Sequence, residues 1–133
     1  MKGLDTPILL GILNGSPSVR PLLRSLSGEE LATTELNMIE LSAIAGHGGV
    51  RGRKERLQAL ERLRRRMTVL PIDRRVTELL SQRAPETRTA ADLHLNMIMA
   101  AFEAAGCSHV LTDSRTPTSH APWKVKVTSI TIK

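Results

Sequence analysis

The sequence is poor in aromatic residues, with no tyrosine, one phenylalanine and one tryptophan. This argues against domains that stack bases on aromatic side chains, such as RRM and OB-fold domains. The single cysteine, Cys107, cannot form an intrachain disulfide, and we expect it to be a small buried residue. The chain has no apolar run of about 18 residues and no signal-like start, so we expect a cytoplasmic protein without a membrane span.

Basic residues are concentrated in one stretch of the chain. The 133 residues fit a single domain, 1–133, and their net charge is +6. The stretch 51–66 alone has eight basic and two acidic residues, with leucines at helical spacing, which predicts an amphipathic helix. Its basic side is either a solvated surface or a surface that contacts phosphate groups. The candidates for nucleic-acid contact are Arg51, Arg53, Lys54 and Arg56, with Arg115 further along the chain.

Hydrophobic periodicity predicts strands that alternate with helices. The expected strands lie at 2–5, 31–34, 68–72, 109–112 and within 123–132. The expected helices lie at 6–14, 17–27 with Ser16 as its cap, around Glu40, at 51–66, from Asp73 to Gln82, and at 92–106. This alternation indicates an α/β fold, with a central, mainly parallel sheet of four to five strands between two layers of helices.

Two acids fall at the predicted carboxyl ends of strands. Asp5 follows a short apolar start, and Asp113 ends the run His109-Val-Leu-Thr. Ligands of open α/β sheets bind outside the carboxyl ends of strands, so these two acids can meet although they are 108 residues apart. Each also has a structural explanation, because Asp5 precedes a helix that Thr6 could cap and Asp113 could begin a turn.

Two further acids fall in predicted helices. Glu40 lies in the segment 36–45, whose apolar residues are predicted to share one helical side: Leu36, Ile39, Ala43 and Ile44. Asp92 begins an apolar helix that ends before Gly106, and we expect it to face inward or to cap the first turn. Structural explanations exist here too, since Glu40 fits an exposed helical position and Thr89 with Asp92 is close to a capping box.

Four clustered carboxylates repel one another unless a cation neutralises them. In their order and spacing the four acids resemble the PIN-domain ribonucleases, and among these the small VapC-type toxins of prokaryotic toxin–antitoxin pairs. The resemblance covers nearly the whole chain. It rests on Leu4-Asp5-Thr6, on Thr34 to Leu41 with its Glu-Leu, on Ala91-Asp92-Leu93-His94-Leu95, and on Gly106-Cys107-Ser-His-Val-Leu-Thr-Asp113.

The resemblance implies cleavage of RNA phosphodiester bonds with Mg²⁺ or Mn²⁺. It maps a catalytic quartet onto Asp5, Glu40, Asp92 and Asp113. In this quartet we expect Asp5 and Asp113 to bind the metal, Asp92 to bind it or to orient a water, and Glu40 to be an outer-sphere partner or general base. Asn96 competes with Asp92 as the residue nearest the metal, because the segment from Asp92 to Asp113 is longer than in many relatives. The resemblance also implies a homodimer that an antitoxin holds inactive.

Two other classes of function remain open. A phosphatase or phosphoacceptor domain also places an Asp after its first strand, but it needs a second acid at position 7, where this chain has Pro7. The second class is a catalytically weak scaffold that binds RNA or an antitoxin. It is kept open by Pro7, which replaces the polar residue usual in the PIN family, and by the long helix that Asp92 begins. Metal-dependent turnover would exclude it.

The C-terminal segment is the least regular part of the sequence. Residues 114–122 include His120 and two prolines, and we expect them to form a loop at the rim of the site. In the last strand, Val125 and Val127 share one face whereas Ile130 and Ile132 share the other. This change of face predicts either a bulge or a strand that leaves the sheet to pair with a partner.

Overall fold

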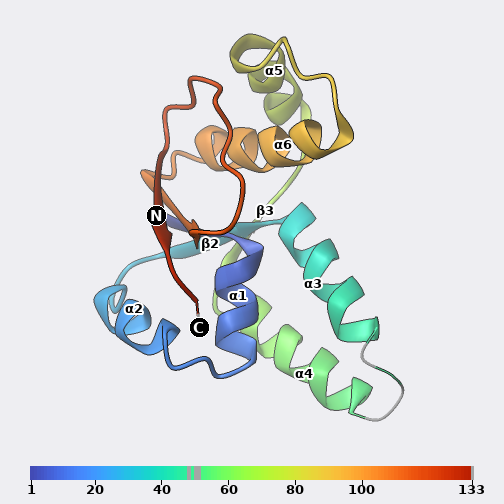
Figure 1. The fold of residues 1–133 in the computed structure, drawn as a ribbon, viewed down its shortest axis with the longest axis vertical. Helices are drawn as coiled ribbons and strands as arrows, with labels where there is room; N and C mark the ends of the chain where they lie inside the picture. The colour runs from blue at the N-terminus through green and yellow to red at the C-terminus, as the bar shows by residue number, and fades with distance from the viewer. Residues whose placement is uncertain (48, 50–51, 133) are drawn as a thin grey trace.

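The computed structural model describes residues 1–132 except 48, 50 and 51, and these residues form a three-layer α/β/α sandwich (Figure 1). All strand pairs are parallel, and the strand order is β3-β2-β1-β4-β5. The strands are β1 (Lys2–Leu4), β2 (Leu31–Thr34), β3 (Thr68–Leu70), β4 (His109–Asp113) and β5 (Lys126–Ile130). The predicted α/β class and parallel sheet are confirmed.

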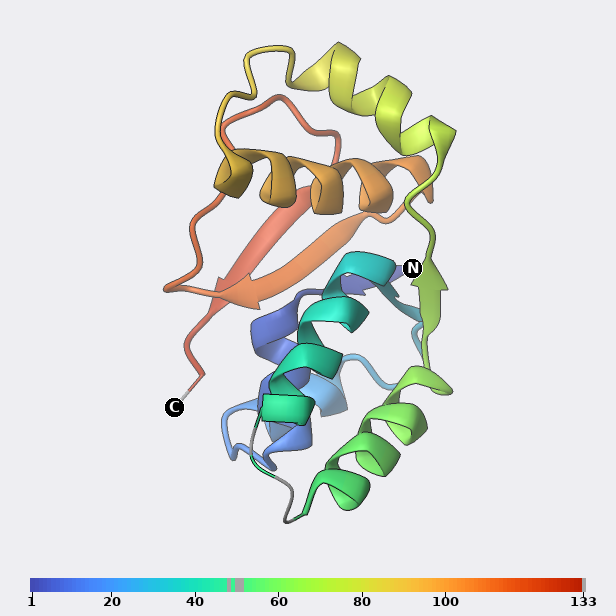
Figure 2. The same cartoon turned by 90° about the vertical axis from the view of Figure 1, so that its right-hand side faces the viewer.

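Helices cover both faces of this sheet. They are α1 (Thr6–Leu13), α2 (Val19–Ser25), α3 (Glu35–His47), α4 (Arg53–Arg64), α5 (Arg74–Arg83) and α6 (Ala90–Ala104). Figure 2 shows α5 and α6 on one side of the sheet and α1 to α4 on the other. In the described part of the chain, no helix combines the length and the apolar character needed to cross a membrane.

Two apolar cores separate the layers, and neighbouring strand residues alternate between them. Val110 packs with Phe102 of α6 and with Cys107, which is buried as expected. The next residue, Leu111, packs on the opposite side with Ile8 and Leu9 of α1. This alternation follows from the period of two in a β-strand, and it decides which side chains at the strand ends reach the same face.

Several predicted helix ends are confirmed. The carboxylate of Asp73 caps α5 by accepting hydrogen bonds from the backbone N–H groups of Arg75 and Val76. Gly106, at φ +77°, terminates α6 in a Schellman motif, in which the N–H of Cys107 donates to the carbonyl of Phe102 over 3.1 Å. The second helix was predicted less well, because α2 begins at Val19 after a turn instead of at position 17.

The predicted apolar side of α3 is wrong. Ile39 and Ile44 are 63% and 46% exposed, whereas the buried residues of this helix are Asn37, Leu41 and Ala45. These three residues are four apart and therefore lie on one helical face. The polar Asn37 is buried because it is fully hydrogen-bonded, a condition that an apolar pattern does not reveal.

The expected bulge or departure of the last strand is also wrong. β5 pairs with β4 in continuous register from His109 with Lys126 to Asp113 with Ile130. Val125 and Val127 pack on the α6 side of the sheet, and Ile130 and Ile132 pack on the α1 side. Both faces of the sheet are covered by helices, so a regular strand can direct apolar side chains to either face.

Gly3 in β1 allows α6 to approach the sheet closely. A Cβ atom at this position would lie 2.5 Å from Cε1 of Phe102, which is fully buried. We expect Gly3→Ala to lower the free energy of unfolding by about 1–3 kcal/mol, the usual cost of overpacking a core. Gly46→Ala in α3 is the matched control, because a Cβ there meets nothing within 4 Å and should stabilise the helix. Urea denaturation measures both, and equal stability of the two variants would contradict this account.

Candidate active site

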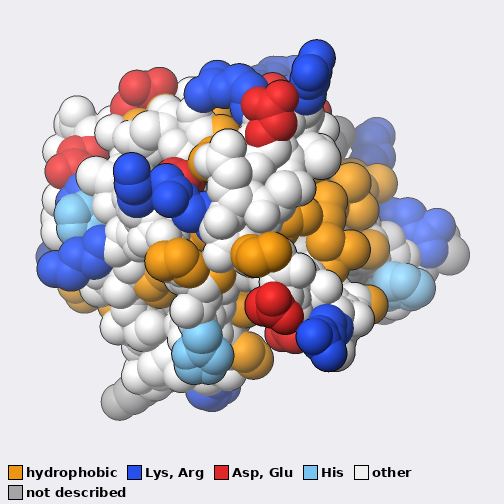
Figure 3. All heavy atoms as spheres, turned by 90° about the horizontal axis from the view of Figure 1, so that it is seen from above, with side chains coloured by type: hydrophobic (Ala, Val, Ile, Leu, Met, Phe, Trp, Pro, Cys, Tyr) orange, Lys and Arg blue, Asp and Glu red, His pale blue; other side chains and the backbone are white. Residues whose placement is uncertain are grey.

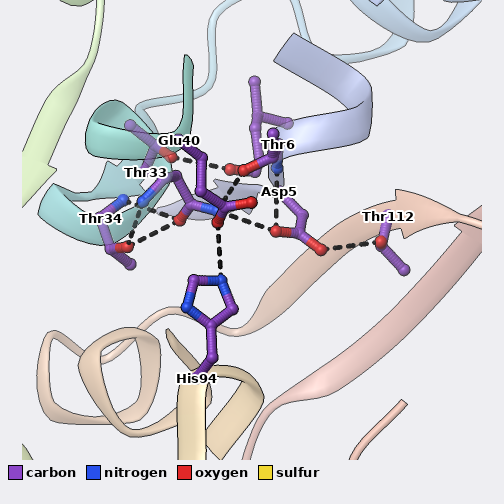
Figure 4. A network of polar contacts seen from close by, with 9 residues as sticks. Asp5, Thr6, Thr33, Thr34, Glu40, His94 and Thr112 are labelled. Carbon is purple, nitrogen blue, oxygen red and sulfur yellow. Dashed lines mark hydrogen bonds and ion pairs between the residues drawn. The ribbon is translucent and has the colours of Figure 1, made fainter. Parts of the chain in front are cut away.

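Asp5 occupies the turn between β1 and α1, where its buried carboxylate is held by three donors (Figure 4). Its Oδ1 accepts hydrogen bonds from the backbone N–H of Thr6 and from Nδ2 of Asn37, each over 2.8 Å. Its Oδ2 accepts a hydrogen bond from the hydroxyl of Thr112 over 2.9 Å. Asp5 itself, not Thr6, is the N-cap of α1. The carboxylate is therefore fixed at the carboxyl ends of two neighbouring strands, β1 and β4.

Asn37 in the first turns of α3 links Asp5 to the neighbouring strand β2. Its Nδ2 donates to Asp5 and, over 2.9 Å, to the hydroxyl of Thr6. Its Oδ1 accepts hydrogen bonds from the backbone N–H and the hydroxyl of Thr34, over 3.2 and 2.7 Å. All donor and acceptor positions of the amide are thus occupied. An amide that is bonded in this way has one orientation, and it presents an N–H group to Asp5.

Glu40 lies one helical turn after Asn37 on α3 and is directed toward α6 (Figure 4). Its Oε1 is 2.8 Å from Nε2 of His94, which lies in the first half of α6. An ionised carboxylate only accepts hydrogen bonds, so Nε2 of His94 is the donor. Glu40 is half-buried, and this contact joins the two helices that flank Asp5.

Asp113 is directed away from Asp5. Because Thr112 reaches Asp5, the next residue of the strand lies on the opposite face, where Ile132 also packs. The carboxylate of Asp113 accepts hydrogen bonds from the backbone N–H, Nε and Nη2 of Arg115 and from the backbone N–H of Ile132, over 2.8 to 3.1 Å. Arg115 also donates to the carbonyl of Ile132. The pair thereby attaches the segment after β5 to the end of β4.

The hydrogen bonds from Arg115 hold the pKa of Asp113 well below its usual range. A carboxyl group with a lowered pKa in the folded state stabilises the fold above its unfolded pKa, and this contribution is lost as the pH falls through the folded pKa. We expect Asp113→Asn to be less stable than the wild type at neutral pH, and the difference to shrink below about pH 4. Urea unfolding as a function of pH measures this difference.

The exposed pair of Arg74 and Glu78 supplies the control for this prediction. Glu78→Gln also removes one carboxylate from an arginine, but exposed ion pairs contribute little to stability. We expect this variant to match the wild type across the same pH range. A stability difference for Asp113→Asn that does not change with pH would contradict the assigned cause.

Asp92 and Asn96 lie at the start of α6, in the wall of a cavity that they share with the loop 114–122. The side chain of Asp92 is exposed instead of facing inward, and the hydroxyl of Thr89 caps the helix by accepting from the N–H of Asp92. Asn96 is buried and bonded through both ends of its amide, to Thr87 and to Ser119. The expected rim loop is therefore anchored to α6 at Asn96.

The basic candidates do not converge on Asp5. Arg53 and Lys54 are exposed in the first turn of α4, and Arg56 donates to the carbonyls of Ala45 and Gly49. Arg115 is bonded to Asp113, and Arg51 lies outside the described residues. Figure 3 shows basic side chains interspersed with acidic ones on the face seen from above, without one continuous basic surface.

Some of the carboxylates in and beside the site fit a hard divalent cation, and others do not. An ionised carboxylate has about four acceptor sites, and the network occupies three of those on Asp5. Mg²⁺ is usually bound by one or two carboxylates and keeps several waters, so Asp5 with Glu40 as an outer-sphere partner is a sufficient protein contribution. Asp113 fits less well because Arg115 occupies it. Among the described residues, no three His, Cys, Asp or Glu side chains gather as a metal cluster.

Three residues of this site were not predicted from the sequence: Asn37, His94 and Thr112. The spacing of Asn37 and Glu40, three apart in one helix, was a usable signal that both lie on one face. A second usable signal was the alternation of side chains along a strand, because Thr112 and Asp113, as neighbours, cannot both be directed at Asp5. The partner of His94 is 54 residues away, and no local pattern identifies it.

Comparison with known proteins gives a consistent result. The profile of the family described as PIN domain matches residues 3–117. No curated protein matches the chain by sequence. The structure of VapBC2 from Rickettsia felis, bound to a fragment of promoter DNA, matches at a TM-score of 0.78 and 13% sequence identity. The structure of VapBC-5 from Mycobacterium tuberculosis matches at a TM-score of 0.66 and 17% identity. Each match covers 97% of this chain and 98% of the other. VapC20 from Mycobacterium tuberculosis, a toxin that cleaves the sarcin–ricin loop, matches at a TM-score of 0.57 and 13% identity over 83% of this chain and 87% of that one.

Proposed function

The chain belongs to the PIN-domain family, and from this premise we propose that it is a metal-dependent endoribonuclease that hydrolyses RNA phosphodiester bonds. The observation that carries the proposal is the buried carboxylate of Asp5, which three donors fix at the carboxyl ends of parallel strands. Ligands of open α/β sheets bind outside these strand ends. Asp5 is thus a preformed anionic group where a substrate would bind.

Each residue of the network has a role in this proposal. Asp5 would hold Mg²⁺ or Mn²⁺, and Asn37 and Thr112 keep its carboxylate in place. When bound, the cation neutralises charge on the phosphate and makes a water more acidic. Glu40 accepts the proton of the attacking water as general base, and His94 orients its carboxylate. Asp113 would become a ligand only after release from Arg115. Asp92 would have to bind the cation from its exposed position on α6.

We further propose that the protein is the toxin of a toxin–antitoxin pair and forms a homodimer. The support is the similarity to VapC-type folds, together with exposed apolar side chains on the helices around the site. These side chains are Ile39 and Ile44 of α3, Leu57 of α4 and Leu93 of α6. An antitoxin segment that covered them would also restrict access to Glu40, which follows Ile39 directly.

Incubation of the purified protein, freed of any bound antitoxin, with total RNA tests the proposal. Cleavage products should appear with Mg²⁺ or Mn²⁺ and disappear with EDTA, and mapping of their ends should give defined positions. Size-exclusion chromatography with light scattering tests the dimer separately. Folded protein that cleaves no RNA with either metal would contradict the nuclease proposal.

A second candidate is a catalytically weak PIN domain that acts as a scaffold for RNA or an antitoxin. The hydrogen bonds between Arg115 and Asp113 favour it, because they occupy an acid that the family resemblance assigns to the metal. The scaffold predicts RNA binding that is unaffected by EDTA and no turnover. The nuclease predicts turnover that is lost with EDTA, so the two candidates are distinguished in one experiment.

A further inference from the structure

A cavity of about 360 Å³ lies beside the first turns of α6. Its walls are the connection between α5 and α6, the start of α6 and the loop 114–122. Pockets that bind small ligands or single groups of a larger ligand begin at about 300 Å³. The cavity therefore has room for one planar base.

Hydrogen bonds hold the walls of this cavity in place before any ligand binds. The Nδ2 of Asn96 donates to the hydroxyl of Thr87 over 2.9 Å, and the hydroxyl of Ser119 donates to Oδ1 of Asn96 over 2.5 Å. Ser119 also accepts hydrogen bonds from the backbone N–H of Ala121 and from Nε1 of Trp123. Asn96 thus acts as a wall residue whose amide already has a partner at each end, and the loop is attached to α6 without a ligand.

Two carboxylates line the cavity, and that of Asp92 is the one available to a ligand, because Glu86 pairs with Arg88. The Asp92 carboxylate is exposed, and among the described residues no group donates a hydrogen bond to it or pairs with it. An ionised carboxylate accepts hydrogen bonds only, so it selects a ligand with N–H or O–H donors. Thr118 and His120 line the same cavity and offer further polar contacts.

We propose that this cavity is a subsite for an unpaired RNA base, with guanine preferred, and that Asp92 reads the base. Guanine has two adjacent donors on its Watson–Crick edge, N1–H and the N2 amino group, which match the two oxygens of a carboxylate. Adenine and cytosine place an acceptor nitrogen beside their amino group, and uracil flanks its single N–H with two carbonyls. The proposal rests on the proposed nuclease function and names the specificity of the same site.

The cavity lies on the other side of α6 from the pair of Glu40 and His94. His94, which contacts Glu40, and Asn96, which lines the cavity, are two residues apart and therefore lie on nearly opposite sides of α6. A single strand that passes around the first turns of α6 would place a phosphate near Glu40 and the base of another of its nucleotides in the cavity. Recognition by hydrogen bonds also agrees with the chain's lack of tyrosine and with the burial of its only phenylalanine, Phe102.

The test uses Trp123 as a reporter of occupancy. It is the only tryptophan, the chain has no tyrosine, and its indole is bonded to Ser119 in the cavity wall. We expect titration of the full-length protein with GMP to change its fluorescence in a saturable way, with a Kd at least about fivefold lower than for AMP, CMP or UMP. Asp92→Asn should weaken GMP about tenfold or more, the scale of one bidentate contact to a base.

Glu29→Gln is the matched control, because it makes the same change of acid to amide at the opposite edge of the fold, beside Lys2. It should bind GMP as the wild type does. Equal affinity for all four nucleotides, or unchanged GMP binding by Asp92→Asn, would overturn the proposal. Its failure is separable from that of the nuclease: RNA cleavage without GMP binding removes only the subsite, and GMP binding without cleavage removes only the nuclease.

Discussion

Replacement of Asp5 by asparagine is expected to abolish metal-dependent cleavage of RNA while leaving the fold intact. The amide oxygen of asparagine can still accept the hydrogen bond from the N–H of Thr6, so the cap of α1 is kept. The negative charge that attracts the cation is lost, and a hard cation binds a neutral amide more weakly than a carboxylate. We expect the cleavage rate to fall by roughly two to three orders of magnitude, the scale of one preorganised electrostatic group.

Asp73→Asn is the matched control for Asp5→Asn. Asp73 is also a helix N-cap whose carboxylate accepts backbone hydrogen bonds, but it begins α5 and lies away from the Asp5 network. Both variants should unfold at similar urea concentrations, and only Asp5→Asn should lose cleavage with Mg²⁺ or Mn²⁺. Retention of cleavage by Asp5→Asn would place the reaction elsewhere on the protein.

Replacement of Asn37 by aspartate is expected to be the most destabilising isosteric change in the site. It removes the donor that now bonds Asp5 over 2.8 Å and puts a second carboxylate against the first. An uncompensated buried charge costs about 3–5 kcal/mol, so the variant should be unstable at neutral pH. The like charge raises the pKa of the new carboxyl group in the folded state. A raised pKa stabilises the folded protein as the pH falls, so the variant should recover stability in mild acid.

Asn96→Asp makes the same change in a different environment. The amide of Asn96 contacts only two hydroxyl groups, those of Thr87 and Ser119, and hydroxyls can rotate to donate to a carboxylate. We expect this variant to lose less than half as much stability as Asn37→Asp. Urea denaturation at neutral pH and in mild acid compares the two. Equal losses would mean that the loss does not arise from the repulsion between residue 37 and Asp5.

The arrangement of the elements was accessible from the sequence because it depends on local patterns. Alternation of apolar runs predicted the parallel sheet, and capping residues predicted the ends of α5 and α6, as at Asp73 and Gly106. The position of Asp5 at the carboxyl end of β1 followed from the same reasoning. These features need only the period of a strand or helix and the chemistry of one residue.

The contacts of the site were less accessible because they join distant segments. The sequence correctly placed Asp113 at the end of a strand, yet the direction of its side chain depends on which residue of β4 bonds Asp5. The burial of Asn37 depends on partners in β1, α1 and β2 together. Apolar periodicity therefore selected the wrong side of α3, because its inner face combines the apolar Leu41 and Ala45 with Asn37, which hydrogen bonds allow to be buried.

The hydrogen bond between Thr112 and Asp5 also has a consequence for biosynthesis. Its two residues are 107 positions apart, and β1 pairs with β4, which is synthesised after β2 and β3. Contacts between residues so far apart in the sequence form slowly, because closing the long loop between them costs entropy. A nascent chain that ends before residue 112 would lack this hydrogen bond to Asp5 and the central pairing of its sheet. Chains that stop before this point, or whose residue 112 is still inside the ribosome, should therefore lack the Asp5 network on which the proposed activity depends.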